Sequence, residues 1–530
     1  MASSGILAIL FLIQSLWKPI FPWDFAKVSG FNPIGSAQAL AVFLGGALVI
    51  LIALINANQN AEETLKQKKS ASDQKTPLKK IIPILAITLG ILLFACIFLI
   101  NFWAAWLGLI FGMSVIILGK LYSISLTTQN ILKNFGIPLI ILVIGLVFIF
   151  IRPVGNILNL LPEVSPTYQS TFDISAKTLM EGPKNFILGA GPATFGYKYS
   201  LYRSPAINLT DFWQVRFNQG AAVLPTWLAT TGILGILAIL FLMTIFFWQG
   251  FKSLISKTPQ PKSKSAKVTE TGSLSTQLSV FAVGFYFLIL WFFYSANFSL
   301  FFAGFLMLGL FVSASNQRID QRFINGSPQK AFGIMLACIV LIAGSVTGIY
   351  TMGQKYVGAL NYTKGLQETE LDQAIIKIQK AINLDNKDIY FRTLSQLYLF
   401  KINQVIQNQK LSQEERQKQL QQNIFLAEGS ALRATRINPA DSLNWLQLGS
   451  IYENFNALNI QGASESAILN YQKAQELDPQ NPQIPFNLGR IYFVTNQLDK
   501  AREETQKSLQ LKPDFQPTIQ LMDQIERPGE

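Results

Sequence analysis

Six long uncharged segments constrain the fold of this chain more than any other feature of its sequence. They cover residues 37–56, 81–100, 102–119, 136–151, 221–248 and 331–350. A helix of about 20 apolar residues crosses the roughly 30 Å hydrocarbon layer of a bilayer. Half of the 530 residues are hydrophobic and only 14% are charged, which gives more apolar surface than one soluble core can bury. We therefore expect a membrane protein with several transmembrane helices.

Two further segments raise the expected number of transmembrane helices to about nine. Residues 277–317 form an uncharged stretch of about twice the needed length, and the polar run SANFS at 295–299 interrupts it. That pattern predicts two helices joined by a tight turn. Residues 2–17 supply a shorter apolar run, which we count as the ninth helix. The expected fold is all-α, with a polytopic transmembrane bundle over residues 1–354 that includes an extracytoplasmic loop at 152–220.

The net charge of +13 comes from the first two-thirds of the chain. Residues 1–354 hold 24 Lys and Arg against 10 Asp and Glu, whereas residues 355–530 hold 19 against 20. The positive loops lie at residues 57–80, 120–135, 249–276 and 316–330. Lys and Arg in short loops mark the cytoplasmic side of a membrane protein. The excess positive charge thus belongs to loops between membrane segments, which is not the charge pattern of a nucleic-acid-binding surface, so we expect no nucleic-acid partner.

One orientation places all four positive loops on the cytoplasmic side of the membrane. With nine crossings, the N-terminus is then cytoplasmic, and residues 355–530 are extracytoplasmic. The stretch 257–272 is rich in Lys, Ser, Thr and Pro, which is typical of a flexible linker on the cytoplasmic side.

The sequence contains no histidine, and this absence excludes several kinds of chemistry. Catalysis by a Ser-His or Cys-His pair and zinc sites built on imidazole both need His. The two cysteines, Cys96 and Cys338, lie inside apolar segments, where thiols pack as small hydrophobic groups. The long apolar segments contain no Asp, Glu, Lys or Arg that could bind or relay an ion, which argues against a transporter. Any chemistry must use Arg, Lys, Asp, Glu or Tyr, and we expect neither a metal nor another cofactor.

After residue 354 the apolar segments give way to amphipathic helices that end in a recurring signal. The signals are AINLD at 381–385, RINP at 436–439, ELDP at 476–479 and QLKP at 510–513. The last two prolines are 34 residues apart, which is the period of the tetratricopeptide repeat (TPR). The Gln-rich stretch 407–422 predicts an inserted or extended helix. We expect residues 355–530 to form a TPR-like α-solenoid of about four repeats whose concave face binds a protein or peptide; a simple spacer is the alternative.

Loop 152–220 is long enough to predict a functional segment. It contains an expected short helix at 173–180 and a glycine turn, GAGP, at 189–192. A cluster of aromatic and cationic residues follows: Tyr197, Lys198, Tyr199, Tyr202, Arg203, Phe212, Trp213, Arg216 and Phe217. Arg binds pyrophosphate bidentately and aromatic faces stack on sugars, so the cluster suits a phosphorylated, sugar-bearing ligand. The alternative interpretation places the rings at the membrane interface and the arginines on lipid headgroups.

The order of these parts resembles the O-antigen ligase and polymerase superfamily. The resemblance rests on the short helix, the GAGPATF turn at 189–195, the Tyr- and Arg-rich stretch and the helix that begins with LATTGILG at 228–235. The sequence FNPIGS at 31–36 is also similar, and the resemblance covers roughly residues 30–315. It implies an enzyme of the bacterial cytoplasmic membrane. Such an enzyme transfers a glycan from a polyprenyl-diphosphate carrier to an extracytoplasmic acceptor, without a metal or nucleotide.

On this interpretation, Arg203 and Arg216 hold the diphosphate and stabilise it as a leaving group, because guanidinium groups stay charged. Asp211 is the nearest carboxylate that can take a proton from an acceptor hydroxyl. Its alternative role is that of a loop cap or a salt-bridge partner of Arg216. The expected substrate-binding residues are Lys198, Tyr202 and Trp213.

The chain departs from the superfamily pattern in three places. A His-Asn pair is usual where this chain has Ala221 and Ala222, and an Arg is usual where it has YQST at 168–171. Members also have more helices, so the resemblance leaves three explanations open: the sequence lacks several N-terminal helices, this branch uses a different catalytic set, or it has lost activity. The sequence therefore leaves open whether the chain is an enzyme. The alternative function is a non-catalytic, membrane-anchored TPR scaffold that recruits partners in the cell envelope.

Overall fold

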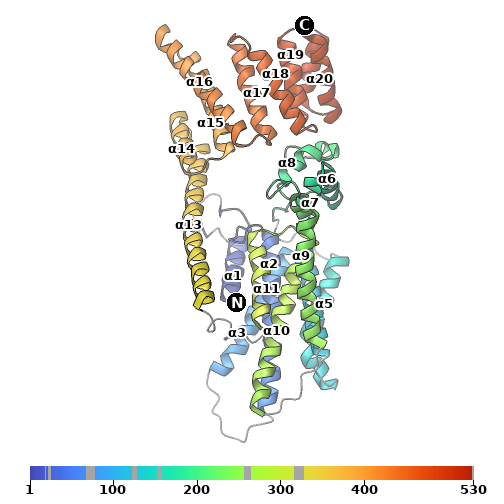
Figure 1. Cartoon of the computed structure of the whole chain (residues 1–530). Helices are drawn as coiled ribbons and strands as arrows, with labels where there is room; N and C mark the ends of the chain where they lie inside the picture. The colour runs from blue at the N-terminus through green and yellow to red at the C-terminus, as the bar shows by residue number, and fades with distance from the viewer. Residues whose placement is uncertain are drawn as a thin grey trace. The chain divides into compact units, whose positions relative to one another are not determined.

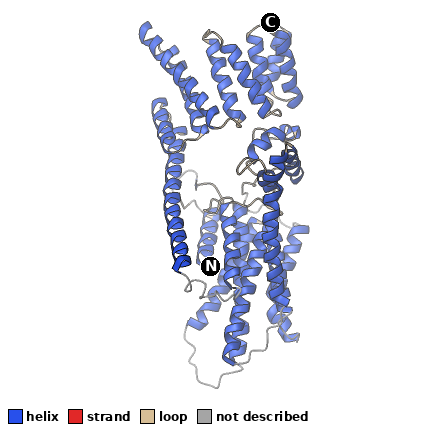
Figure 2. Cartoon of the chain, viewed as in Figure 1, coloured by secondary structure: helices blue, strands red, loops and turns tan. Residues whose placement is uncertain are grey.

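The computed structural model of the chain describes residues 1–17, 20–21, 26–66, 78–121, 128–151, 158, 160–255, 264–314 and 328–527. The chain divides into two compact units. We call residues 1–195 and 219–318 the bundle unit, and residues 196–218 and 319–530 the repeat unit. The named elements of the described residues are all helices, as Figure 2 shows, so the all-α expectation is confirmed for this part of the chain.

Each of the nine expected membrane segments contains a helix (Figure 1). Those in the bundle unit are α1 (Ala2–Leu16), α2 (Ala37–Lys66), α3 (Leu78–Ile100), α4 (Trp103–Leu121), α5 (Thr128–Phe150), α9 (Val223–Ile255), α10 (Lys264–Leu290) and α11 (Phe298–Ala314). The ninth, α13 (Pro328–Leu366), belongs to the repeat unit. Within the described residues, α2, α3, α4, α9 and α13 are long and apolar enough to cross a membrane, and the other four apolar stretches are shorter. The number of crossings stays a prediction.

Glycines let the central helices of the bundle unit approach one another closely. The ring of Tyr286 on α10 is fully buried, and its hydroxyl donates to the carbonyl of Val42 on α2 at 2.8 Å. A Cβ at Gly108 on α4 would lie 2.5 Å from this ring, and a Cβ at Gly45 on α2 would also clash with it. Only glycine leaves room for the tyrosine between these helices, because packed interiors have no spare volume.

A pair of glycines joins the glycine turn at 189–192 to helix α9. Gly232 has φ 65° inside α9, which breaks the helix, and Gly189 ends α7 (Pro183–Leu188) with φ 70°. A Cβ on Gly232 would lie 2.5 Å from the backbone nitrogen of Gly189. At the break, the amides of Ala190 and Gly191 donate to the carbonyls of Ala229 and Thr230, both at 2.9 Å. The turn therefore satisfies helix carbonyls that the break leaves without partners.

The repeat unit is a row of helical hairpins, as the sequence predicts. The pairs are α13 with α14 (Leu371–Leu384), α15 (Asp388–Gln407) with α16 (Gln413–Ile437), α17 (Ser442–Ala457) with α18 (Ala463–Leu477), and α19 (Gln483–Val494) with α20 (Leu498–Leu511). Helix α21 (Gln516–Glu526) packs on α19 and α20. The second helix of each pair ends inside one of the four recurring signals, which confirms their interpretation as helix ends.

The extended helix predicted for the Gln-rich stretch is α16. A capping box starts it, in which the Ser412 hydroxyl accepts from the amide of Glu415 and the Glu415 carboxylate accepts from the amide of Ser412. This reciprocal pair satisfies amides that the first turn leaves free. Within the next hairpin, Tyr471 of α18 is fully buried against Gly449 of α17, where a Cβ would lie 2.5 Å from the ring. The missing side chain of Gly449 on the first helix therefore leaves space for the ring of Tyr471 on the second helix.

Parts of the basic loops used to predict the orientation lie outside the described residues, namely 67–77, 122–127, 256–263 and 315–327. The expected linker at 257–272 is outside them up to residue 263, whereas residues 264–272 form the start of α10. The orientation therefore stays a prediction. The short helix expected at 173–180 is α6, which begins earlier, at Tyr168, and ends at Met180.

Candidate functional site

Residues 196–218, which carry the aromatic and cationic cluster, pack on the turns between successive repeats. They contain most of α8 (Phe195–Tyr202) and the 3-10 helix η2 (Pro205–Leu209). The contacted turns follow α16, α18 and α20, so one segment touches three hairpins of the same unit. At the first turn, Asn438 Nδ2 donates to the Tyr197 hydroxyl at 2.7 Å. These turns contain the Asn-Pro, Asp-Pro and Lys-Pro residues of the recurring signals.

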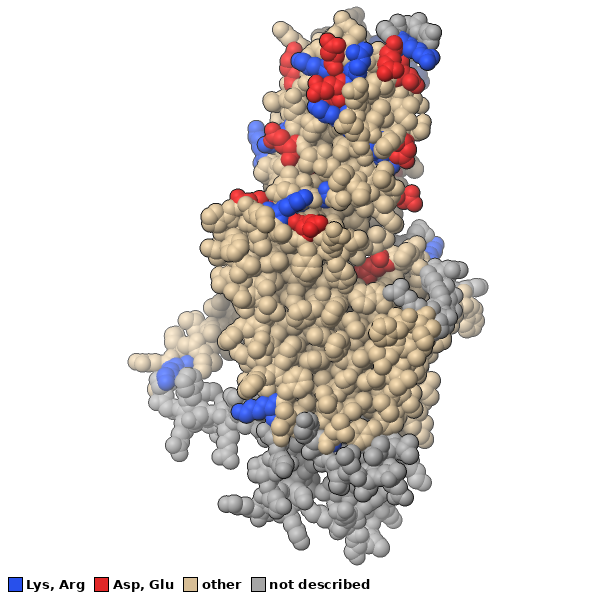
Figure 3. All heavy atoms as spheres, turned by 90° about the vertical axis from the view of Figure 1, so that its right-hand side faces the viewer, with Lys and Arg blue, Asp and Glu red and all other residues tan. Residues whose placement is uncertain are grey.

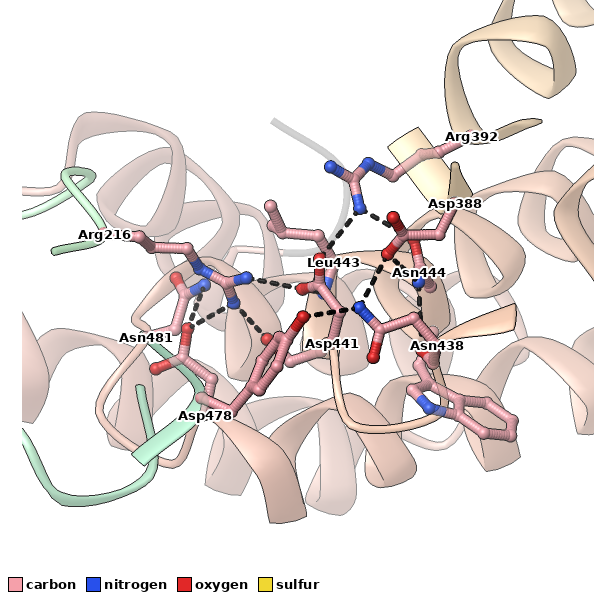
Figure 4. A network of polar contacts seen from close by, with 12 residues as sticks. Arg216, Asp388, Arg392, Asn438, Asp441, Leu443, Asn444, Asp478 and Asn481 are labelled. Carbon is pink, nitrogen blue, oxygen red and sulfur yellow. Dashed lines mark hydrogen bonds and ion pairs between the residues drawn. The ribbon is translucent and has the colours of Figure 1, made fainter. Parts of the chain in front are cut away.

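Arg216 is the centre of this contact (Figure 4). Its Nη1 donates to Asp441 Oδ1 at 2.6 Å, and its Nη2 donates to Asp478 Oδ2 at 3.1 Å and to the Ser442 hydroxyl. Asp441 precedes α17 as its N-cap, where Oδ1 also accepts from the amide of Leu443 at 3.0 Å. One arginine thus bridges two consecutive turns through their carboxylates.

Arg203 forms the more deeply buried half of the cluster. Its Nη2 lies 3.3 Å from Asp478 Oδ1, and the two side chains are only 4% and 2% exposed. Its Nη1 donates to the carbonyl of Trp213 at 2.7 Å, which folds the segment back on itself. Asp478 therefore pairs with both arginines, one through each carboxylate oxygen. Buried charges of this kind persist only when they are paired.

Polar and aromatic contacts extend the packing to the last repeat. Asn208 is fully buried and donates from Nδ2 to the carbonyl of Gln480 at 2.8 Å. Lys512 Nζ donates to the carbonyl of Asn208 at 2.9 Å and lies 5.5 Å from the centre of the Trp213 ring. The Trp213 ring meets the Phe515 ring edge to face, with centroids 5.5 Å apart. The segment is thus anchored on the repeats at both ends and in the middle.

The electrostatics of the cluster are those of a closed ion-pair network. Burial alone would raise the pKa of Asp441, but the guanidinium groups of Arg216 and Arg392 outweigh it and hold the pKa below its usual range. Arg392 on α15 donates to Asp441 Oδ2 at 3.2 Å and to Asn444 Oδ1 at 2.7 Å. Both oxygens of Asp441 therefore accept from arginine, and the carboxylate stays ionised at neutral pH.

The structure places the six predicted site residues in one segment but gives them different surroundings. Arg203 and Arg216 pair with carboxylates of the repeats, and Trp213 packs on Phe515. Asp211 is exposed and is not the carboxylate that pairs with Arg216. Lys198 and Tyr202 are half-buried. A diphosphate that bound both arginines would have to displace Asp441 and Asp478.

Sequence reasoning missed the partners of the two arginines. Asp441 and Asp478 belong to turns that the sequence marks only as ends of repeat helices, and they lie 225 and 275 residues away from Arg216 and Arg203 along the chain. The available signal was an acidic residue within two positions of a proline in a repeat turn, in a segment with about as many acidic as basic residues. That signal does not indicate which basic residue an acidic side chain in these turns pairs with.

A second candidate site is an open cavity of about 490 Å³ on the first helices of three successive hairpins. Helices α15, α17 and α19 each contribute to its walls. The lining residues are Arg392, Thr393, Gln396, Leu443, Leu446, Gln447, Ser450, Gln483, Asn487 and Arg490. We call this cavity the repeat groove. The groove therefore spans three successive hairpins.

The two arginines of the repeat groove are held by acidic side chains of the same unit. Arg490 makes a bidentate pair with Glu453, through Nε at 2.6 Å and Nη2 at 2.8 Å. Arg392 pairs with Asp441, as described above. The other polar groups of the groove are mainly side-chain amides and hydroxyls. Within the described part of the chain, no three Cys, Asp or Glu side chains gather in the manner of metal ligands.

A match to one family model supports the repeat assignment. Residues 456–495 match the family model of the TPR repeat, which covers the end of α17 and the whole of α18 and α19. Among solved structures, the chain is similar to the crystal structure of MamA protein, with 21% identity and a TM-score of 0.25. That similarity covers 34% of this chain and 81% of MamA. No curated protein matches the chain.

Proposed function

We propose that this chain is a membrane-anchored scaffold that holds an extended segment of a partner protein in the repeat groove. The observation that carries the proposal is the cavity of about 490 Å³ that three first helices of successive hairpins line together. TPR arrays commonly offer such a concave surface to partners. A binding site that continues across several repeats suits an extended chain better than it suits a compact small molecule.

The chemistry of the repeat groove supports a peptide as the occupant. An extended peptide has free backbone amides and carbonyls, and the side chains of Gln396, Gln447 and Asn487 offer both donors and acceptors to them. Leu443 and Leu446 add apolar contact area. Because Arg392 and Arg490 already pair with acidic side chains, the groove does not require a highly acidic ligand.

The anchoring half of the proposal rests on the apolar helices. Five of the described helices are long and apolar enough to cross a bilayer, and the loops between apolar segments carry most of the positive charge. We propose the bacterial cytoplasmic membrane as the location, with the N-terminus in the cytoplasm and the repeats outside it. In that arrangement the repeats meet partners of the cell envelope.

A peptide-display selection against the full chain in lipid nanodiscs tests the scaffold proposal. We expect selected peptides to bind with a measurable Kd, and Gln447→Arg in the groove to weaken binding at least tenfold by filling the site with a bulky cation. Leu469→Arg is the matched control, because Leu469 is 67% exposed on the second helix α18 and does not line the groove. Equal affinity of both variants and the unmodified chain would contradict the proposal.

Glycan transfer from a lipid-linked donor is the second candidate function. The close contact of Gly189 with Gly232 favours it, because this contact joins two sequence motifs on which the superfamily resemblance rests. On this hypothesis Arg203 and Arg216 bind the diphosphate, Asp211 takes the acceptor proton, and Lys198, Tyr202 and Trp213 contact the substrate. The pairing of both arginines with Asp441 and Asp478 weighs against it, since the cations are already neutralised.

A transfer assay with the purified chain and a lipid-linked oligosaccharide separates the two functions. On the glycan-transfer hypothesis, Arg216→Lys lowers the rate about a hundredfold, because one bidentate contact to a developing charge is worth roughly 3 kcal/mol. Asp441→Asn is the control, since it weakens the ion pair between Arg216 and the repeats but keeps the guanidinium group of Arg216. Transfer that survives Asp441→Asn and fails in Arg216→Lys would support a catalytic arginine. Absence of transfer in the unmodified chain would favour the scaffold.

A further inference from the structure

Two short helices of the bundle unit present an unusual number of large apolar side chains to the surface. On α6, Phe172 is 51% exposed and Met180 is 82% exposed. On α7, three consecutive residues, Phe186, Ile187 and Leu188, are 52%, 50% and 54% exposed, and α7 has no buried residue at all. We call these five side chains the α6–α7 apolar face. Large apolar side chains that are exposed close together usually mark a contact with another molecule or with lipid.

The position of α7 against α9 indicates what covers this face. The contact of Gly189 with Gly232 and the two hydrogen bonds beside it fix the end of α7 at the break in α9. The exposed stripe of α9 starts directly after that break, with Leu234 at 56%, Leu237 at 58% and Phe241 at 68%. The exposed apolar residues of α7 therefore lie next to the point where the exposed apolar stripe of α9 begins, and α9 is long enough to span a membrane. In Figure 3, uncharged atoms cover most of the visible face of the bundle unit.

The spacing of charged residues on α6 agrees with a helix that lies flat in a membrane interface. Phe172, Ala176 and Met180 are four residues apart and share one line along the helix, while Asp173 and Lys177 occupy the neighbouring line. Lys184 is exposed in the first turn of α7. Apolar side chains beside lysines are typical of interfacial helices, in which the lysine ammonium reaches the headgroups.

We propose that the α6–α7 apolar face docks into the headgroup and acyl boundary of the bilayer, and that α6 and α7 form an interfacial anchor at one end of α9. The occupant is phospholipid rather than a protein partner, because the α7 part of the face adjoins the exposed apolar stripe of α9, the helix that we propose spans the membrane. The inference rests on the proposal that α9 spans a membrane. Interfacial docking holds the glycine turn at the membrane surface. This turn closely precedes residues 196–218, the segment that packs on the repeats.

Site-directed fluorescence quenching in nanodiscs tests this placement with the full chain. Cys96→Ala and Cys338→Ser remove the native thiols, and a bimane label is attached in turn at Phe186→Cys, Leu237→Cys or Phe425→Cys. The discs contain phosphatidylcholine and phosphatidylglycerol, with a nitroxide either near the headgroup or deep in the acyl chain. Leu237 reports on the spanning helix, and Phe425 is a matched aqueous control because it is 73% exposed on repeat helix α16.

We expect the Phe186 label to be quenched more strongly by the shallow nitroxide than by the deep one, with no quenching of the Phe425 label. Quenching at Leu237 without quenching at Phe186 would overturn the interfacial anchor while leaving the membrane-spanning role of α9 intact. A shielded, unquenched Phe186 label would mean that protein covers the face, which also overturns the proposal. Absence of quenching at Leu237 would overturn both the anchor and the spanning role.

Discussion

Replacing Asp478 with asparagine should release residues 196–218 from the repeats. Asp478 is the carboxylate that pairs with both Arg203 and Arg216, and its side chain is 2% exposed. Asparagine keeps the shape of the side chain and removes its charge. Arg203, whose side chain is 4% exposed, then faces a neutral group in a place that water hardly reaches.

The expected effect is large because the substitution leaves a buried charge without its partner. Removing one member of a buried ion pair typically costs 3–5 kcal/mol, whereas loss of an exposed pair costs less than about 1 kcal/mol. We take about 3 kcal/mol, the lower end, because Arg216 keeps Asp441 and the segment can relax outward. An increase of this size in the free energy of docking corresponds to roughly a hundredfold change in the population of the released state.

Hydrogen exchange with mass spectrometry on the full chain in detergent measures this release. Peptides that cover residues 196–218 should lose roughly a hundredfold in protection, while peptides of α9 stay unchanged. Asp499→Asn is the control, because that aspartate is fully exposed in the same unit. Unchanged protection of the segment in Asp478→Asn would refute the view that this ion pair holds it.

Three further outcomes follow from the structure. The pKa of Asp441 is lower in the folded protein than in the unfolded chain, where it is about 4. The stabilisation that Asp441 gives to docking is therefore complete above about pH 4 and is lost as the pH falls through the lower pKa of the folded protein. Protection of the segment from hydrogen exchange should be constant from pH 7 to about 4 and decline below it. Gly232→Ala should destabilise the bundle unit by about 2 kcal/mol or more, seen as a lower Tm, because φ is 65° and a Cβ would collide with backbone atoms. Gly309→Ala is the control: a Cβ there would have no atom within 4 Å, so the Tm should stay unchanged or rise. Reporter fusions at Ser265 and Glu530 should report opposite sides of the membrane, and fusions on the same side would contradict nine crossings.

The repeat helices could be predicted from the sequence because their signal is local. An Asn, Asp or Lys, usually followed by a proline, breaks the amphipathic pattern of each second helix, and α14, α16, α18 and α20 each end at the residue directly before it. The apolar segments are likewise local, and each of them contains a helix. Their boundaries moved where polar residues extended the helix beyond the apolar run, as in α13, which continues to Leu366.

The surroundings of Arg203 and Arg216 could not be predicted, because the determinants are far apart in the chain. The sequence shows cations among aromatic rings, a pattern that suits an anionic ligand, a lipid headgroup or an acidic protein surface equally well. Only the fold brings Asp441 and Asp478 to these arginines. The close contact of Gly189 with Gly232 was hidden for the same reason, since each glycine alone predicts only a turn or a flexible point in a helix.

A double-mutant cycle between Arg203 and Asp478 tests the central claim, that the cations of the loop serve to hold residues 196–218 on the repeats. Protection of the segment from hydrogen exchange is measured in the full chain, in Arg203→Gln, in Asp478→Asn and in the double variant. We expect each single variant to lose protection and the double variant to lose little more, with a coupling of about 1–3 kcal/mol. Losses that simply add would show that the two side chains do not act on each other, and would contradict the account.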